Sequence, residues 1–493
     1  MPAIRWSRIC SSASATIALG VVGVAAQGAA VVEPDLTALM ARETGAAQRL
    51  PVLLHLKRQP DASAISKRAA VLPQAARGGS IRESLQAFTR ESQAPLLQDL
   101  QTRRAEQVLP LVTVNAVAAR LTSRDIRELA TRDDLASIRF DVGLVAPSRR
   151  VAADPCKPAR PTPRQRLPKY CRDGGAKPPA AVAAAFDAAL PVTPMLAVLG
   201  APQAWKQGYT GKGVTVAIVD TGVDASHPDV GGSFRGGAAD WFDAHGEHKR
   251  PMDLHGHGSQ LAGLVSGRGH NGQTLGVAPQ AQWIAARVYN GQNVARLSDL
   301  HRINAWLLDP DAKADTADAP QIVLNAWGFG GRPGRCDVEF AADVQWLRLA
   351  GMHVVFAAGN GGPQENTSVS PANNKGALSV GALDAGGQLS LFSSRGVSAC
   401  DARPYPDLTA PGEMLRTTDR AAGPIAATTV ASGTSYAAAV VAGELALLVQ
   451  AKPSAKAEER ESALRAVPGD SQPALTRALG LLGGRAASAG GKD

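Results

Sequence analysis

The chain has 493 residues, enough for two or three domains, and a net charge of +9. The basic excess lies in the front part, because the first 186 residues carry +12 and the remainder carries −3. Aromatic residues are scarce and are not interleaved with the basic ones, which argues against nucleic-acid binding. Beyond the N-terminus, no apolar stretch is long enough to span a membrane.

Residues 1–30 are typical of an export signal. Two arginines precede an apolar run from Ala15 to Ala26, and small residues up to Ala30 fit a cleavage point. An uncleaved anchor helix is the alternative interpretation, and the short apolar run favours the cleaved signal. We therefore expect a secreted protein, periplasmic or extracellular, with no membrane segment after signal removal.

Four cysteines remain after the signal. They are Cys156, Cys171, Cys336 and Cys400. An even number in an exported protein favours two disulfides, although four buried thiols are the alternative. Of the three pairings that the sequence allows, we predict Cys156–Cys171, which closes a short loop, together with Cys336–Cys400.

Residues 31–145 form the first predicted domain. Apolar segments and helical periodicity give the order β-α-β-β-α-β, which is typical of a small ferredoxin-like α+β unit. The predicted strands and helices occupy 51–56, 80–101, two stretches within 109–121, 123–131 and 135–140. An unrelated small α+β domain is the alternative.

The remaining chain divides by composition. Residues 146–190 are rich in Pro, Ala and basic residues, which predicts an exposed linker. In residues 191–450, short apolar segments alternate with helical ones, which predicts an α/β fold: a doubly wound, mostly parallel sheet with helices on both faces. Residues 451–493 are polar, and this composition predicts a C-terminal tail whose last dozen residues are disordered.

Four residues in short motifs are candidates for chemistry. Asp220 ends an apolar strand, His257 lies in Gly-His-Gly-Ser, Asn360 ends Ala-Ala-Gly-Asn, and Ser435 begins an apolar helix in Gly-Thr-Ser. Each also has a structural interpretation as a turn residue or a helix cap. His257 with the nearby His255 also fits a metal pair, but no Cys or further His completes a ligand set.

Taken together and in this order, the motifs resemble the subtilisin-like serine peptidases, or subtilases. The matching stretches span about 194–450, and residues 31–145 more faintly resemble the inhibitory propeptide of that family. The stretches that match the peptidase part of the family are Val-Asp-Thr-Gly-Val-Asp at 219–224, Gly-His-Gly-Ser at 256–259, Leu-Gly-Val-Ala-Pro at 275–279, Ala-Ala-Gly-Asn at 357–360, Leu-Thr-Ala-Pro-Gly at 408–412 and Gly-Thr-Ser at 433–435.

The resemblance implies a secreted serine endopeptidase that hydrolyses peptide bonds through an acyl-enzyme and is synthesised as a self-processing zymogen. Ser435 is then the nucleophile, His257 the base, Asp220 its orienting carboxylate, and Asn360 an oxyanion donor. Its partners are protein or peptide substrates and its own prosegment as inhibitor. The implied substrate-binding walls are Ala326, Trp327 and Gly328 on one side, and Ala357, Ala358 and Gly359 on the other.

The sequence also departs from the family pattern. Ser259, Gln260 and Tyr436 stand where Thr, His and Met are common. No cofactor is required by the resemblance, and no metal-binding residue is assigned. Calcium is left open, because Asp229 matches a family ligand whereas the loop 269–274 departs from the usual calcium loop. A catalytically dead scaffold protein and a maturase with one target are the alternative functions.

Overall fold

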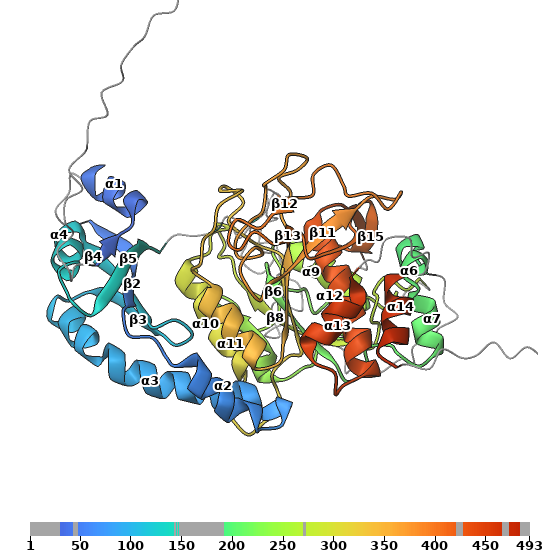
Figure 1. Cartoon of the computed structure of the whole chain (residues 1–493), viewed down its shortest axis with the longest axis horizontal. Coiled ribbons are helices and arrows are strands. Elements are labelled where there is room, and N and C mark those ends of the chain that lie inside the picture. The colour runs from blue at the N-terminus through green and yellow to red at the C-terminus, as the bar shows by residue number, and fades with distance from the viewer. Residues whose placement is uncertain are drawn as a thin grey trace, which may run out of the picture.

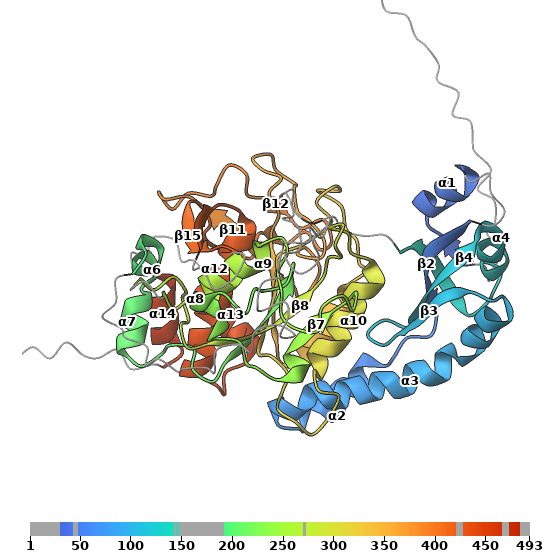
Figure 2. The same ribbon diagram turned by 180° about the vertical axis from the view of Figure 1, so that it is seen from behind.

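The computed structural model describes residues 30–42, 48–141, 144, 146, 192–269, 273–420, 427–465 and 473–483. They form two units, drawn in blue to cyan and in green to red in Figure 1. Figure 2 shows that the first unit curves under the second, with a long helix along its lower edge.

The first unit is built on one sheet. Its elements are β1 (Val31–Val32), α1 (Pro34–Arg42), β2 (Arg49–Leu56), α2 (Ala62–Ala70), α3 (Gln74–Thr102), β3 (Glu106–Leu111), β4 (Ala116–Thr122), α4 (Ser123–Leu129) and β5 (Leu135–Phe140). The strand order is β1-β5-β2-β4-β3, with β2 antiparallel to both β4 and β5. The helix α4 begins at a capping box in which Thr122 and Asp125 satisfy each other's backbone N–H groups.

The second unit begins with α6 (Pro194–Leu199) and α7 (Ala201–Lys206) and contains a sheet of seven described strands in the order β14-β11-β10-β9-β6-β8-β7. Every neighbouring pair in it is parallel. The strands are β6 (Thr215–Asp220), β7 (Trp241–Asp243), β8 (Gln282–Arg287), β9 (Ile322–Asn325), β10 (His353–Ala357), β11 (Leu378–Leu383) and β14 (Leu408–Pro411). Four short strands lie outside it: β12 (Gly396–Val397), β13 (Pro404–Tyr405), β15 (Leu415–Thr418) and β16 (Thr428–Ala431).

Helices cover both faces of this sheet. Val216 and Ile218 of β6 join one apolar cluster with α9 (His257–Ser266) and α12 (Thr434–Ala451). The intervening Ala217 and Val219 join a second cluster with α10 (Leu297–Leu308) and α11 (Ala341–Leu349). Alternate residues of a strand face opposite sides, so this division confirms the predicted parallel sheet between two helical layers.

The segment expected to be a polar tail instead continues as two helices. They are α13 (Ala457–Leu464) and α14 (Ala474–Leu481), and α14 packs on α6 and α7. Leu464, Leu475 and Leu479 are buried in the same apolar cluster as α12. The tail prediction is therefore wrong for these two helices, and the last helix of the second unit packs on its first two.

Contrary to the expectation from the sequence, one helix among the described residues, the central α12, is long and apolar enough to cross a membrane, but 83% of that stretch is buried. It carries a buried acid, Glu444, which is 3% exposed. Burial raises the pKa of Glu444 to about 8, although the positive charge of Arg477 on α14 acts in the opposite direction. The carboxyl is therefore mostly protonated in the fold at neutral pH.

This burial predicts a loss of stability with rising pH. Glu444 ionises near pH 4.5 in the unfolded chain. The stability that the neutral carboxyl contributes to the fold is therefore complete below pH 4.5 and is lost as the pH rises from about 4.5 to 8. We expect Glu444→Gln to raise the free energy of unfolding at pH 8 by about 2–4 kcal/mol, and hardly at pH 4.5. Urea titrations at both pH values measure this. The matched change Glu83→Gln, at an exposed site, should leave the free energy of unfolding unchanged at both pH values. Equal gains from Glu444→Gln at both pH values would contradict the prediction.

The two units share a close contact through α3. A Cβ added to Gly78 would lie 2.0 Å from Leu308 O, and one on Gly79 would lie 2.4 Å from Ala314 Cα. Arg82, one turn further along, donates to Asp309 O at 2.7 Å. The start of α3 therefore lies backbone to backbone against the end of α10, which requires glycine at both positions.

Candidate functional site

Two of the expected site residues are hydrogen-bonded at the carboxyl edge of the sheet. Asp220 is the last residue of β6 and His257 is the first of α9, and both are buried. Asp220 Oδ1 lies 2.8 Å from His257 Nδ1 and also accepts the N–H of Thr221 at 2.8 Å. The carboxylate thus holds the imidazole by Nδ1, which leaves Nε2 as the nitrogen for proton transfer.

A second carboxylate, Asp253, organises the turn that presents His257. It accepts backbone N–H groups of the turn 255–259 at 2.7–2.9 Å, and the hydroxyls of Ser259 and Thr221 at 2.8 and 3.0 Å. Sequence reasoning missed this role. The available signal was an Asp placed just before a Gly-rich turn, where its side chain reaches N–H groups ahead of it.

Ser435 is the second residue of α12 and is 8% exposed. Its neighbour Tyr436 contacts His257 edge to face, with 5.6 Å between ring centroids. The Tyr436 hydroxyl donates to Gln260 Oε1 at 2.7 Å, which ties the start of α12 to α9. Two departures from the family pattern, Gln260 and Tyr436, therefore bond to each other and place the Ser435 turn beside His257.

Asn360 follows β10 and is held against the same helix start. Its Oδ1 accepts the N–H of Thr434 at 3.0 Å and the Thr434 hydroxyl at 2.9 Å. The donor Nδ2 lies beside Gly433, because a Cβ on Gly433 would be 3.6 Å from it. With Oδ1 occupied, the amide presents its N–H groups at the turn that carries Ser435.

The predicted wall segments extend from two adjacent strands. Ala326, Trp327 and Gly328 follow β9, and Ala357, Ala358 and Gly359 end or follow β10. Because β9 and β10 are paired in parallel, the two segments leave the same sheet edge side by side. The Trp327 ring packs on Phe340 and Phe356 in the core, with centroids 5.2 and 5.4 Å apart. The Trp327 side chain is therefore part of the core, and only its backbone lies along the sheet edge beside Ala358.

The predicted disulfide between Cys336 and Cys400 is present, with 4.8 Å between the Cα atoms. It ties together the ends of the segment that carries Asn360. Cys156 and Cys171 lie outside the described residues, so their pairing stays a prediction. Non-reducing peptide mapping should recover a Cys156–Cys171 peptide, and a peptide joining Cys171 to Cys336 would contradict both assignments.

Calcium binding stays open. Asp229 is buried in α8 (Pro228–Gly231), and part of the loop 269–274 lies outside the described residues. Within the described ranges, one group of acidic side chains is close enough to share an ion: Asp309, Asp311 and Asp318. Asp229 does not belong to that group.

Comparison with known proteins places the site in a family. A model described as the subtilase family matches residues 211–479. The chain is 32% identical over 289 residues to bacillopeptidase F and 34% identical over 285 residues to serine protease AprX, both of Bacillus subtilis (strain 168). These matches span 54% and 52% of this chain, but 19% and 62% of the relatives. The major intracellular serine protease of the same organism is 31% identical over 256 residues, covering 51% of this chain and 73% of that protein.

Proposed function

Because this chain belongs to the subtilase family, whose members are serine peptidases, we propose that it is a secreted serine endopeptidase made as a self-processing zymogen. The observation that carries the proposal is the hydrogen bond between Asp220 and His257, beside the helix start that bears Ser435. The export signal predicted from the sequence and the Cys336–Cys400 disulfide support secretion, because disulfides persist in oxidising compartments.

In the proposed mechanism, Ser435 Oγ attacks the scissile carbonyl while His257 Nε2 takes its proton. His257 then protonates the leaving amine, and water hydrolyses the acyl-enzyme by the same route. Asp220 holds the ring and stabilises the imidazolium. The oxyanion receives hydrogen bonds from Asn360 Nδ2 and from the Ser435 N–H at the positive end of α12.

The oxyanion role predicts a specific kinetic defect. Asn360→Ala should lower kcat by about 10²–10³, because the amide donates to charge that exists only in the transition state, and should change KM little. Steady-state kinetics on a peptide substrate measure both constants. Gln364→Ala, an exposed change on the same loop, is the control. A variant that altered only KM would assign Asn360 to substrate binding instead.

A catalytically dead scaffold is the competing function, and the retention of Asp220, His257 and Ser435 argues against it. A fluorophosphonate probe that labels Ser435 of the purified protein would support the enzyme, and absence of labelling would support the scaffold. A proteome-derived peptide library then separates a broad peptidase, with many cleaved sequences, from a maturase with one target.

We further propose that the first unit is a ferredoxin-like inhibitory prosegment. The turn between β3 and β4 inserts at the layer of α10 and α11. There the Thr113 hydroxyl donates to Asp343 Oδ1 at 2.5 Å, and Trp346 Nε1 donates to Thr113 O at 2.8 Å. Thr113 and Asp343 are each 1% exposed. This contact covers the helical face without touching the catalytic residues.

The segment that follows β5 is hydrogen-bonded to the second unit, and this contact supports the proposed inhibition. Leu144 O accepts the N–H of Ala295, and the Ala146 N–H donates to Asn293 O, both at 3.0 Å. The two bonds pair this segment with residues 293–295 in the manner of an added strand. This pairing holds the end of the first unit on the second unit.

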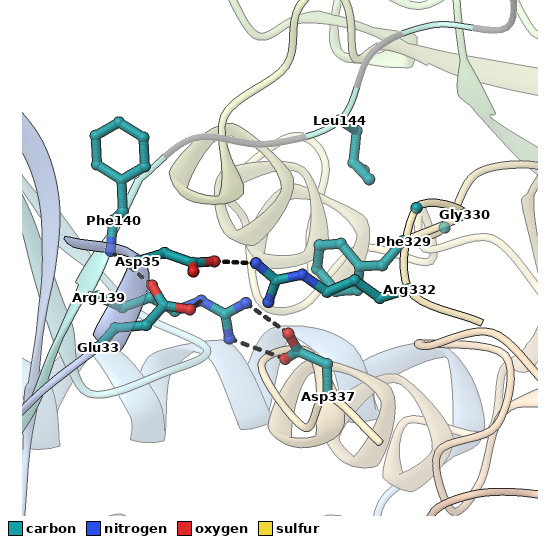
Figure 3. A pocket seen from close by; sticks show the side chains of 11 residues that line it. Glu33, Asp35, Arg139, Phe140, Leu144, Phe329, Gly330, Arg332 and Asp337 are labelled. Atoms are coloured by element: carbon teal, nitrogen blue, oxygen red, sulfur yellow. Dashed lines mark hydrogen bonds and ion pairs between the residues drawn. The ribbon is translucent and has the colours of Figure 1, made fainter. Parts of the chain in front are cut away.

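Opposite charges line the junction between the units. A cavity of about 430 Å³ lies there, and Figure 3 shows Arg139 of β5 facing Asp337, and Arg332 facing Asp35 of α1. Arg139 donates to Asp337 Oδ1 and Oδ2 at 2.8 and 2.6 Å, and to Glu339 Oε2 at 3.0 Å. The junction therefore holds ion pairs of both polarities: Arg139 of the first unit binds acids of the second unit, and Arg332 of the second unit binds Asp35 of the first.

A further inference from the structure

We propose that Val369 fills the specificity pocket and restricts cleavage to peptide bonds that follow a small residue, Ala or Gly. This inference rests on the proposed peptidase function and identifies its class of substrates. The pocket in question lies between the two wall segments, and it would receive the side chain on the N-terminal side of the scissile bond, the P1 side chain.

Val369 lies between the walls. A Cβ added to Gly328 on one wall would be 3.1 Å from Val369 Cγ1, and a Cβ added to Gly359 on the other would be 2.8 Å from Val369 Cγ2. Each methyl group of Val369 therefore faces one wall, in the space that a side chain on that glycine would need. The valine is 5% exposed, so it is enclosed by its neighbours.

The backbone around Val369 is fixed to the segments it separates. Ser370 O accepts the N–H of Phe329, next to Gly328, and Ser368 O accepts the N–H of Gly334, both at 2.8 Å. On the other wall, the Val369 N–H donates to the buried Tyr405 hydroxyl at 3.5 Å, and that hydroxyl donates to Ala358 O at 2.6 Å.

The Val369 side chain is itself stiff, because a β-branched residue has few accessible χ1 rotamers. Its fixed backbone and few rotamers prevent it from moving aside for a substrate.

The consequence for substrates is steric. A P1 Ala adds one methyl group to the site, whereas a P1 Leu or Phe needs the volume that the Val369 methyl groups occupy. Close-packed protein interiors do not yield such volume without strain. Because one methylene changes kcat/KM by about 10–200-fold, we expect Ala to be preferred to Phe by at least about 100-fold.

The test uses enzyme produced from the full chain, with its active sites titrated by a fluorophosphonate. The substrates are acyl-Ala-Ala-Ala-X p-nitroanilides in which X is Ala, Leu or Phe. The unmodified enzyme should cleave the Ala substrate best. Val369→Gly should shift the ratio of kcat/KM for Phe over Ala upward by at least about 100-fold, and Val369→Ala by an intermediate amount. Val198→Ala, at a site 68% exposed on α6, should leave the ratio unchanged.

The outcomes separate the two proposals. Labelled enzyme that cleaves Phe as well as Ala, or an unchanged ratio in Val369→Gly, would overturn the pocket assignment and leave the peptidase intact. Protein that neither takes the label nor cleaves any of the peptides would overturn the proposed function together with the inference. Should the glycine variant fail to fold, the profile of the unmodified enzyme alone decides the question.

Discussion

Replacing Ser435 by Ala is expected to abolish peptide hydrolysis and to leave the precursor at full length. In the proposed mechanism the hydroxyl at the start of α12 attacks the peptide carbonyl, and neither His257 nor the oxyanion donors can replace it. The expected loss in kcat is about 10⁶-fold, the loss that follows removal of the nucleophile in subtilisin. Peptide hydrolysis and the intact mass of the purified protein are the measurements.

Ser432→Ala is the matched control, because it removes an exposed hydroxyl three residues earlier. That variant should mature and hydrolyse peptides. A Ser435→Ala protein that reached mature size with no added peptidase would show that another residue is the nucleophile. It would also remove the basis for self-processing.

Arg139→Ala is expected to weaken inhibition by the prosegment about 30- to 5,000-fold. The guanidinium binds Asp337 with two hydrogen bonds and Glu339 with a third. Removing it takes away the cation bound to Asp337, whereas Glu339 keeps His301 Nε2 at 2.9 Å. Truncating one partner of such a pair costs about 2–5 kcal/mol. Progress curves of mature enzyme with a separately expressed segment 33–150 give the inhibition constant.

A control variant and the salt dependence of binding show whether the effect of Arg139 is specific and electrostatic. Arg124→Ala removes the same charge from α4, where Arg124 pairs with Glu128 within the prosegment, and should inhibit normally. Added salt should slow association more than it speeds release, because attraction is screened over about 10 Å at 0.1 M. A salt-independent association rate would reject the electrostatic part. Absence of inhibition at micromolar segment would reject the inhibitor assignment.

The central features of the peptidase unit could be predicted from sequence because they depend on local rules. An acid at the end of an apolar strand, such as Asp220, and a hydroxyl at a helix start, such as Ser435, occupy positions set by the alternation of strands and helices. Parallel strands then bring these positions to one edge, whereas the pairing of Asp220 with His257 was expected only because the ordered motifs resemble those of the subtilases.

What the sequence did not reveal depends on contacts between distant segments. The helices α13 and α14 are short, and short helices owe their stability to packing rather than to propensity. The bond between Tyr436 and Gln260 joins two helices, and nothing in either motif announces it. Val369 likewise gains its place between Gly328 and Gly359 only when three separate segments meet.

The two glycines at the start of α3 bear on how this protein behaves among its relatives. Any side chain at Gly78 or Gly79 would collide with backbone atoms of the opposite unit. A foreign prosegment with ordinary residues there can fold correctly and still fail to seat on this peptidase. With the first unit as the proposed inhibitor, this peptidase would then accept its own first unit and reject a related one that carries side chains at these two positions.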